Sequence, residues 1–164
     1  MNTPDIKLFL SDVDGVMTDG GLYFTESGDQ FKRFHVHDGM AFLLLKEAGI
    51  KTGIITSEKL KLIELRVKRI QPDYLRMGVG FSDKLDAAKE ICNSEGISLK
   101  QVAYIGDDVN CIDLLKAVGL AACPANAVEA VQKLPGILRL HRSGGQGAVR
   151  EFADLILNAL RLSK

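Results

Sequence analysis

The sequence predicts an α/β fold: a doubly wound, mostly parallel, Rossmann-like sheet with helices on both faces. Two observations lead to this prediction. Short apolar runs of strand length alternate with longer segments in which apolar residues recur at helical spacing, a pattern typical of successive strand–helix–strand units. The chain has 164 residues and is 46% hydrophobic, which suits one domain over residues 1–164 with a single sizeable core.

The expected strands are short apolar runs bounded by glycine, proline or charged residues. In order along the chain they cover residues 7–11, 51–55, 74–77, 102–105, 120–122 and 137–140. Helical spacing predicts helices over residues 39–48, 58–70 and 82–94, one ending near 118, a short one before Pro135, and a last one over 148–162. Asp38, Ser57 and Asn126 are the expected N-terminal caps, because their side chains can accept hydrogen bonds from free backbone N–H groups.

A β-hairpin is expected directly after the first strand. Two β-prone runs, residues 22–25 and 30–36, flank a polar turn at 26–29, a spacing typical of hairpins. The predicted flap, about residues 21–37, interrupts the usual step from strand to helix. At the other end of the chain, a glycine-rich stretch and the last helix form a C-terminal segment of about residues 143–164.

The composition limits the partners and the compartment. Lysine plus arginine and aspartate plus glutamate each number 21, so the net charge is zero, and no nucleic acid or membrane partner is expected. No apolar run is long enough to cross a bilayer, and no secretory signal is recognisable at the start. Cys92, Cys111 and Cys123 are an odd number without metal-site spacing. They suggest free thiols in the cytoplasm.

Polar residues stand where three of the predicted strands end, and a lysine stands near the start of a helix. They are Asp12 and Asp14, Thr56 and Ser57, Asp107 and Asp108, and Lys84. The carboxyl ends of parallel strands meet at one edge of a sheet, where α/β proteins bind ligands. Asp12 and Asp14 point to the same side of an extended chain. They repel each other unless a cation such as Mg²⁺ lies between them.

This set of groups suits phosphoryl transfer. One carboxylate can attack phosphorus to form an aspartyl-phosphate, and a second can move protons. A metal ion, a hydroxyl and an ammonium can neutralise and orient the phosphoryl oxygens. Each residue alone has a simpler explanation: Thr56 as a strand end, Lys84 as a solvated lysine, Asp107 and Asp108 as charges at a helix N-terminus. Their order and their common edge favour the catalytic interpretation.

The same residues resemble the four sequence motifs of the haloacid dehalogenase superfamily of phosphatases. The matching stretches are Asp12-x-Asp14-Gly15, Thr56 after an apolar strand, Lys84, and Gly106-Asp107-Asp108. The resemblance implies that Asp12 is the nucleophile and that Asp14 is the general acid and then the general base. It implies that Thr56 and Lys84 hold the phosphoryl group. The implied Mg²⁺ ligands are the Asp12 carboxylate, the Asp14 backbone carbonyl and Asp107, with Asp108 nearby.

The intervals between these motifs leave no room for a cap domain. Only the hairpin and one helix separate Asp12 from Thr56, and only a helix and a strand separate Thr56 from Lys84. A single subunit would therefore leave its site open to water. A phosphatase without a cap either acts on macromolecules or has its site closed by a neighbouring subunit.

A narrower resemblance favours closure by a neighbour. Thr18-Asp19-Gly20, Asp38-Gly39 and the run from Gly144 to Glu151 are similar to the 3-deoxy-D-manno-octulosonate 8-phosphate phosphatase family, whose relatives hydrolyse nonulosonate 9-phosphates. This resemblance implies a 2-keto-3-deoxy sugar acid phosphate as substrate, in cell-surface sugar biosynthesis. It implies a homo-oligomer, most simply a tetramer, whose hairpins and glycine-rich segments complete neighbouring sites. Asp38 and Gly145 are then expected to bind substrate, although the glycines alone indicate only a flexible turn.

Two features depart from the octulosonate pattern. Ser57-Glu58 stands where that pattern has Gly-Arg, and Glu58 with Arg66 and Arg69 resembles the nonulosonate branch. A solvated helix face explains these charges equally well, but they favour a nine-carbon substrate slightly over an eight-carbon one. On one helix Glu58 and Arg69 would lie about 16 Å apart, so Arg69 is expected to serve a neighbouring subunit. Cys111 replaces a further aspartate, which is expected to weaken metal binding.

Two other classes of protein share parts of this pattern. A phospho-aspartate receiver domain also carries acidic residues, threonine and lysine on a doubly wound sheet. There the lysine comes last, whereas here Lys84 precedes the second acidic pair. A non-catalytic, tetramer-forming phosphatase-like module would not need the complete set that this chain retains. The leading prediction is a Mg²⁺-dependent phosphatase.

Overall fold

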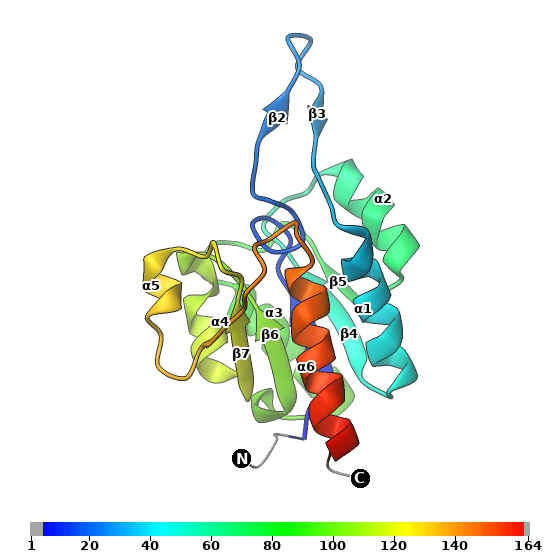
Figure 1. The fold of residues 1–164 in the computed structure, drawn as a ribbon, viewed down its shortest axis with the longest axis vertical. Helices are drawn as coiled ribbons and strands as arrows, with labels where there is room; N and C mark the ends of the chain where they lie inside the picture. The colour runs from blue at the N-terminus through cyan, green and yellow to red at the C-terminus, as the bar shows by residue number, and fades with distance from the viewer. Residues whose placement is uncertain (1–4, 163–164) are drawn as a thin grey trace.

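The computed structural model describes residues 5–162. Within them a six-stranded sheet has the order β5–β4–β1–β6–β7–β8, and β2 and β3 form a separate hairpin (Figure 1). The strands of the sheet are β1 (Leu8–Ser11), β4 (Lys51–Ile55), β5 (Tyr74–Arg76), β6 (Val102–Ile105), β7 (Leu120–Cys123) and β8 (Leu138–Arg139). All neighbouring pairs are parallel, which confirms the predicted fold class.

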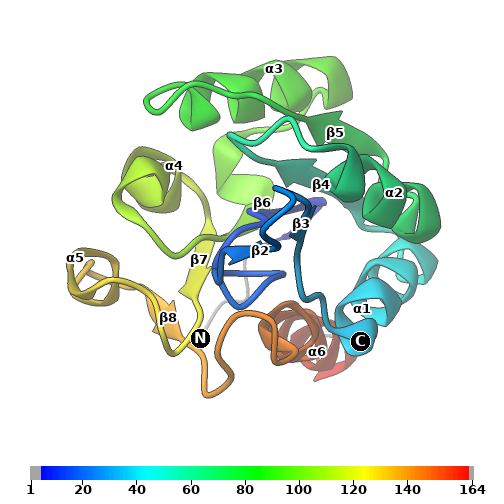
Figure 2. The same ribbon diagram turned by 90° about the horizontal axis from the view of Figure 1, so that it is seen from above.

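Helices cover both faces of the sheet (Figure 2). They are α1 (Val36–Glu47), α2 (Lys61–Ile70), α3 (Lys84–Glu95), α4 (Ile112–Ala117), α5 (Glu129–Gln132) and α6 (Ala148–Leu162), with 3₁₀ turns at Leu99–Gln101 and Val109–Cys111. The first, second and sixth helices pack on one face, and the third, fourth and fifth on the other. Among the described residues, no helix is both long and apolar enough to span a bilayer.

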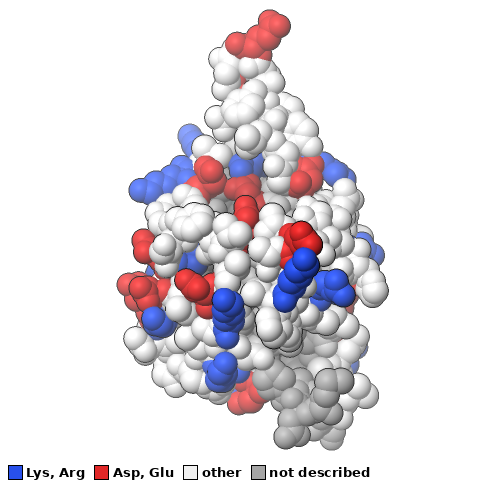
Figure 3. All heavy atoms as spheres, turned by 90° about the vertical axis from the view of Figure 1, so that its left-hand side faces the viewer, with Lys and Arg blue, Asp and Glu red and all other residues white. Residues whose placement is uncertain are grey.

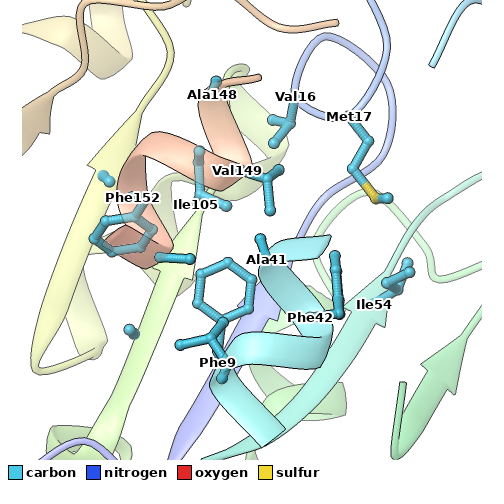
Figure 4. Packing of buried hydrophobic residues seen from close by; sticks show 14 of the residues in the cluster. Phe9, Val16, Met17, Ala41, Phe42, Ile54, Ile105, Ala148, Val149 and Phe152 are labelled. Carbon is cyan, nitrogen blue, oxygen red and sulfur yellow. The ribbon is translucent and has the colours of Figure 1, made fainter. Parts of the chain in front are cut away.

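Three phenylalanines form the centre of the core on the α1 and α6 side. The ring of Phe9 in β1 lies 5.8 Å from that of Phe42 in α1 and 5.7 Å from that of Phe152 in α6 (Figure 4). All three are fully buried, and truncating such a ring to alanine costs about 3–5 kcal/mol of stability. This packing fixes β1, and with it the strand end that carries Asp12.

The connections between the strands hold no cap domain in the described part of the chain. The hairpin and α1 fill the interval from β1 to β4, and α2, β5 and α3 fill the interval from β4 to β6. The helices of these connections pack on the sheet and belong to its two core layers. The carboxyl ends of β1, β4 and β6 are therefore not covered by an inserted domain.

The hairpin is shorter than predicted and projects away from the sheet and helices (Figure 1). Its strands are β2 (Tyr23–Phe24) and β3 (Gln30–Phe31), with an isolated antiparallel bridge between Thr18 and Phe34 nearer the sheet. Val36, predicted to end the second strand, instead begins α1. The reason is local: the His35 imidazole accepts a hydrogen bond from the His37 backbone N–H and caps the helix.

The predicted cap of α1, Asp38, has a different role. Because α1 begins earlier than predicted, Asp38 lies in its first turn rather than before it. The side chain is buried, and Oδ1 accepts a hydrogen bond at 3.0 Å from the backbone N–H of Arg150, in the first turn of α6. Asp38 therefore ties the start of one helix to the start of another.

Ser57 and Asn126 are not helix caps either. The chain after β4 continues as a loop, in which Thr56 Oγ1 accepts a hydrogen bond at 3.2 Å from the Glu58 N–H, and α2 begins without a side-chain cap. Asn126 Oδ1 accepts a hydrogen bond at 2.8 Å from the Gly144 N–H. It thus holds the glycine-rich segment rather than α5.

Candidate active site

The carboxyl ends of β1, β4 and β6 open on a cavity of about 270 Å³. It is lined by Asp12, Asp14, Gly15, Gly20, Thr56, Ser57, Glu58, Lys84, Asp107, Asp108 and Asn110. All seven polar residues predicted from the strand ends and the helix start are among them. The fold therefore brings together groups that are far apart in the sequence.

Asp12 and Lys84 form a buried ion pair beside this cavity. Asp12 is 5% exposed and Lys84, the first residue of α3, is 1% exposed. Lys84 Nζ donates to Asp12 Oδ2, while Asp12 Oδ1 accepts a hydrogen bond at 2.7 Å from the Val13 N–H. Burial alone would lower the pKa of Lys84, but the charge of Asp12 and other neighbouring groups outweigh it and raise that pKa. The carboxylate of Asp12 is thus fixed at both oxygens.

Cys111 packs against this ion pair. Its thiol donates to Asp12 Oδ2 at 3.1 Å and accepts hydrogen bonds from Lys84 Nζ at 3.4 Å and the Tyr104 hydroxyl at 3.2 Å. Burial, and then the charge of Asp12, raise the pKa of Cys111 to about 12. The group is therefore a neutral thiol at neutral pH. Where an aspartate would add negative charge beside Asp12, this chain places an uncharged hydrogen-bonding group.

Asp107 lies close to Asp12 and against the backbone of Gly15. A Cβ on Gly15 would stand 1.9 Å from Asp107 Oδ2, and the φ of +72° also favours glycine. Burial, and then the charges of Asp12 and Asp108, raise the pKa of Asp107 to about 7. Ligand atoms of Asp12, Asp107 and Cys111 all lie within 4.8 Å of one another. Asp108 is exposed and caps the 3₁₀ turn after β6.

Asp14 pairs with Lys32, a hairpin residue that no sequence motif marks. Lys32 Nζ donates to Asp14 Oδ1, and the Lys32 side chain is only 7% exposed. Thr18 Oγ1 donates to the same oxygen at 3.3 Å. In the sequence Lys32 is one of 21 basic residues and lies 18 positions from Asp14. Only the fold distinguishes it from a solvated lysine.

The loop after β4 contributes three residues to the cavity. Thr56 is buried, whereas Ser57 and Glu58 are exposed at its edge. Because Glu58 precedes α2, the prediction that Glu58 and Arg69 lie on one helix is wrong. Glu58 therefore faces the site from a loop.

Four predicted substrate-binding residues lie outside this cavity. Arg66 and Arg69 line a separate groove of about 500 Å³ between the hairpin and α2, and Arg66 also donates at 2.9 Å to the carbonyl of the residue that caps α1. Asp38 is buried beside the start of α6. The Gly145 N–H donates to Val16 O at 3.1 Å, so the glycine-rich segment lies against the loop after β1. A role for these residues in a neighbouring subunit's site stays a prediction.

The fold and the residues at its edge define a hydrolase of the haloacid dehalogenase type. A family model described as haloacid dehalogenase-like hydrolase matches residues 25–135. The chain belongs to this family.

Within it the chain is similar to 3-deoxy-D-manno-octulosonate 8-phosphate phosphatase KdsC. The Yersinia pestis protein of that name is 39% identical over 156 residues, which cover 94% of this chain and 81% of the relative. The Escherichia coli K12 protein is 35% identical with the same coverage. The solved Moraxella catarrhalis phosphatase, in complex with magnesium ion, phosphate ion and KDO molecule, is 34% identical with a TM-score of 0.88, covering 95% of this chain and 88% of the other.

Proposed function

We propose that this chain is a Mg²⁺-dependent phosphatase that hydrolyses 3-deoxy-D-manno-octulosonate 8-phosphate through an aspartyl-phosphate. The observation that supports this most is the convergence of Asp12, Asp14, Thr56, Lys84 and Asp107 on one small cavity. Relatives with this enzyme name match nearly the whole chain. Membership of a hydrolase family argues against a receiver domain, and the complete set of groups argues against a non-catalytic module.

The residues around Asp107 fit a Mg²⁺ ion. Burial, and then the neighbouring like charges, raise the pKa of Asp107, and a divalent cation between the carboxylates would relieve the repulsion. Mg²⁺ prefers hard oxygen ligands, which Asp12, Asp107 and the Asp14 backbone carbonyl would supply, with Asp108 nearby. Cys111 offers no such oxygen, so we expect weaker binding than with an aspartate there. When bound, the ion would neutralise charge on the phosphoryl oxygens.

In the first half-reaction the Asp12 carboxylate attacks the phosphorus of the ester. The bond from phosphorus to the sugar oxygen breaks, and Asp14 supplies the proton with which that oxygen leaves as an alcohol. Lys84 and the Thr56 hydroxyl hold the phosphoryl oxygens during the transfer. Because Lys84 already fixes Asp12, the nucleophile needs little reorientation before it attacks.

In the second half-reaction a water molecule hydrolyses the aspartyl-phosphate. Asp14, now a carboxylate, takes a proton from the water as the water oxygen attacks phosphorus. The bond between phosphorus and the Asp12 oxygen breaks, which releases inorganic phosphate and restores the Asp12 carboxylate. The exposures of the two residues suit these roles: the Asp14 side chain is 34% exposed and can reach solvent, whereas that of Asp12 is 7% exposed.

Glu58 supports a second candidate substrate, a nonulosonate 9-phosphate. Glu58 lines the cavity, and its carboxylate could accept hydrogen bonds from sugar hydroxyls there and would repel a nearby substrate carboxylate. A nine-carbon chain offers more hydroxyls than an eight-carbon one. Arg66 or Arg69 of a neighbouring subunit could then bind the substrate carboxylate. The names of the relatives favour the eight-carbon acid, which is therefore the leading candidate substrate.

The test is phosphate release from both sugar acid phosphates, with glucose 6-phosphate as an unrelated control, in Mg²⁺ and in EDTA. We expect the largest kcat/KM for the octulosonate and loss of turnover in EDTA. A nonulosonate preferred by about tenfold or more would select the second candidate. No release from either sugar acid phosphate in Mg²⁺ would contradict the proposed function.

We further propose that the chain forms a homo-oligomer, most simply a tetramer, through its hairpin. Leu22, Phe24 and Phe31 on the hairpin are 76%, 56% and 56% exposed. Figure 3 shows the hairpin as a largely uncharged projection with acidic side chains at its tip. Exposed apolar groups gathered in this way suit contact with another protein surface. Light scattering at the assay concentration tests this, and a fully active monomer would contradict it.

We also propose that the protein is located in the cytoplasm. Cys92, Cys111 and Cys123 are all buried and free of disulfide bonds. Free thiols are usual in a reducing compartment, which supports that location. Fractionation of the producing cells tests it, with recovery in the cytoplasmic fraction as the expected result.

A further inference from the structure

The side chain of Lys32 is largely buried, although the residues on either side of it, Phe31 and Arg33, are exposed. Its neighbour Phe31 is 56% exposed, whereas the Lys32 side chain is 7% exposed. Removing an ammonium group from water is costly unless an opposite charge compensates it. The compensating charge is Asp14, which accepts a hydrogen bond from Lys32 Nζ.

The hairpin has other contacts that hold its base in place. The Tyr23 hydroxyl donates to Asp19 Oδ2 at 2.6 Å, and Arg33 lies 3.8 Å from the same oxygen. An antiparallel bridge joins Thr18 and Phe34. The ion pair of Lys32 is therefore not the only contact that attaches the hairpin, and it joins the hairpin to Asp14, a residue that lines the cavity.

Both groups that donate to the Asp14 carboxylate reach the same oxygen. Lys32 Nζ and Thr18 Oγ1 both donate to Oδ1, and among residues 5–162 no other group donates to this carboxylate. The Asp14 side chain nevertheless keeps 34% of its surface exposed. One oxygen is thus anchored, and the structure shows no donor from residues 5–162 to Oδ2.

We infer that Lys32 is a positioning residue for the proposed reaction. It fixes Asp14 through Oδ1. Once Oδ2 has taken up a proton from solvent, it can give that proton to the leaving oxygen and can later take one from water. The inference rests on the proposed function and extends it, because it makes the hairpin part of the catalytic apparatus of its own subunit. A displacement of about 1 Å in such a group can lower a rate by about 10²-fold.

An ester whose leaving group needs no proton separates this role from a purely structural one. With 4-nitrophenyl phosphate, Asp12 attacks phosphorus and the bond to the aryl oxygen breaks to release the 4-nitrophenolate anion. No proton from Asp14 is required. Hydrolysis of the resulting aspartyl-phosphate still requires Asp14 to take a proton from water. A misplaced Asp14 should therefore spare the first step and slow the second.

The test measures stopped-flow release of 4-nitrophenolate at saturating Mg²⁺. For Lys32→Met we expect a first-turnover rate within about threefold of wild type and a steady-state rate lower by about 10–100-fold. Because the first step is then faster than the second, the variant should release a burst of 4-nitrophenolate that approaches one equivalent per active site. Lys32→Arg keeps a cation and should recover much of the steady-state rate. The matched control is Lys89→Met, which breaks the exposed ion pair of Lys89 with Asp86 on α3 and should behave as wild type.

Equal losses in the first turnover and the steady state of Lys32→Met would overturn the inference, as would a steady-state rate within about twofold of wild type. Thermal unfolding and light scattering establish that each variant is folded and assembled as the wild type is. If Lys32→Met does not fold, Lys32→Gln is measured in the same way. A failure of the proposed function is seen separately, because the wild type itself would then release no 4-nitrophenolate.

Discussion

Replacing Gly144 with alanine is expected to disable the site although Gly144 does not line it. Gly144 belongs to the glycine-rich segment before α6. A Cβ on it would stand 1.9 Å from the carbonyl oxygen of Gly15 and 2.7 Å from that of Thr18. Both neighbours are backbone atoms, so no side chain can rotate away. The loop that follows Asp14 would have to move.

The overlap sets the size of the expected effect. Real Cβ contacts essentially never fall below 3.0 Å, so the two segments must separate by about 1 Å or more. Overpacking of this kind costs about 1–3 kcal/mol of folding free energy, and a displacement of about 1 Å at a catalytic group can cost about 10²-fold in rate. Gly15 directly follows Asp14 in the chain and packs against Asp107, so a shift of Gly15 would displace both carboxylates. We therefore expect kcat to fall by about 10–100-fold in a folded protein.

The assay combines kcat and KM for the preferred sugar acid phosphate with urea unfolding. Gly136→Ala is the matched control, because Gly136 has a φ of +76° but no atom within 4 Å of the added Cβ. It should lose about 1 kcal/mol of stability from its backbone conformation and keep its kcat. A folded Gly144→Ala variant with a kcat within about twofold of wild type would refute the coupling between the two segments.

Three further substitutions test separate parts of the structure. Asp12→Asn should leave the fold intact and abolish turnover, because an amide cannot attack phosphorus; more than about 5% of the wild-type kcat would argue against this nucleophile. Glu58→Arg should shift the ratio of kcat/KM for the two sugar acids towards the octulosonate by about 1–3 kcal/mol, and an unchanged ratio would remove Glu58 from substrate selection. Asp38→Asn should alter the pH dependence of stability. Burial raises the pKa of Asp38 to about 6, above its value in the unfolded chain, so its contribution to stability falls as the pH rises from about 4 to 6. Urea unfolding at about pH 4.5 and 6.5 should show the wild type losing about 2 kcal/mol relative to the variant; parallel changes in both proteins would contradict this.

The strands and the residues at their ends could be predicted because that information is local. Apolar runs bounded by polar residues predict β4 and β6 with their observed bounds, and helical periodicity does the same for α6. Parallel topology then places the strand ends at one edge of the sheet. Asp12, Thr56 and Asp107 meet there for this reason, without any knowledge of side-chain contacts.

Contacts between distant segments could not be predicted in this way. Lys32 reaches Asp14 only because the second strand of the hairpin returns the chain to the loop after β1. Asp38 has the residue type of a cap for its own helix, but its acceptor is used by the backbone of Arg150 in another helix. The contacts of Lys32 and Asp38 both depend on tertiary packing that the local sequence does not encode.

The central claim is that Asp12 carries the phosphoryl group, and chemical trapping tests it most directly. The protein is mixed with octulosonate 8-phosphate and Mg²⁺, quenched in acid and reduced with borohydride, which converts an aspartyl-phosphate to homoserine. Peptide mass spectrometry then locates the modified residue. We expect homoserine at position 12 and none without substrate. The Asp14→Asn variant given 4-nitrophenyl phosphate should accumulate more of it, because its second step is slowed. Homoserine at another position, or phosphate release with no trapped adduct in either protein, would contradict the mechanism.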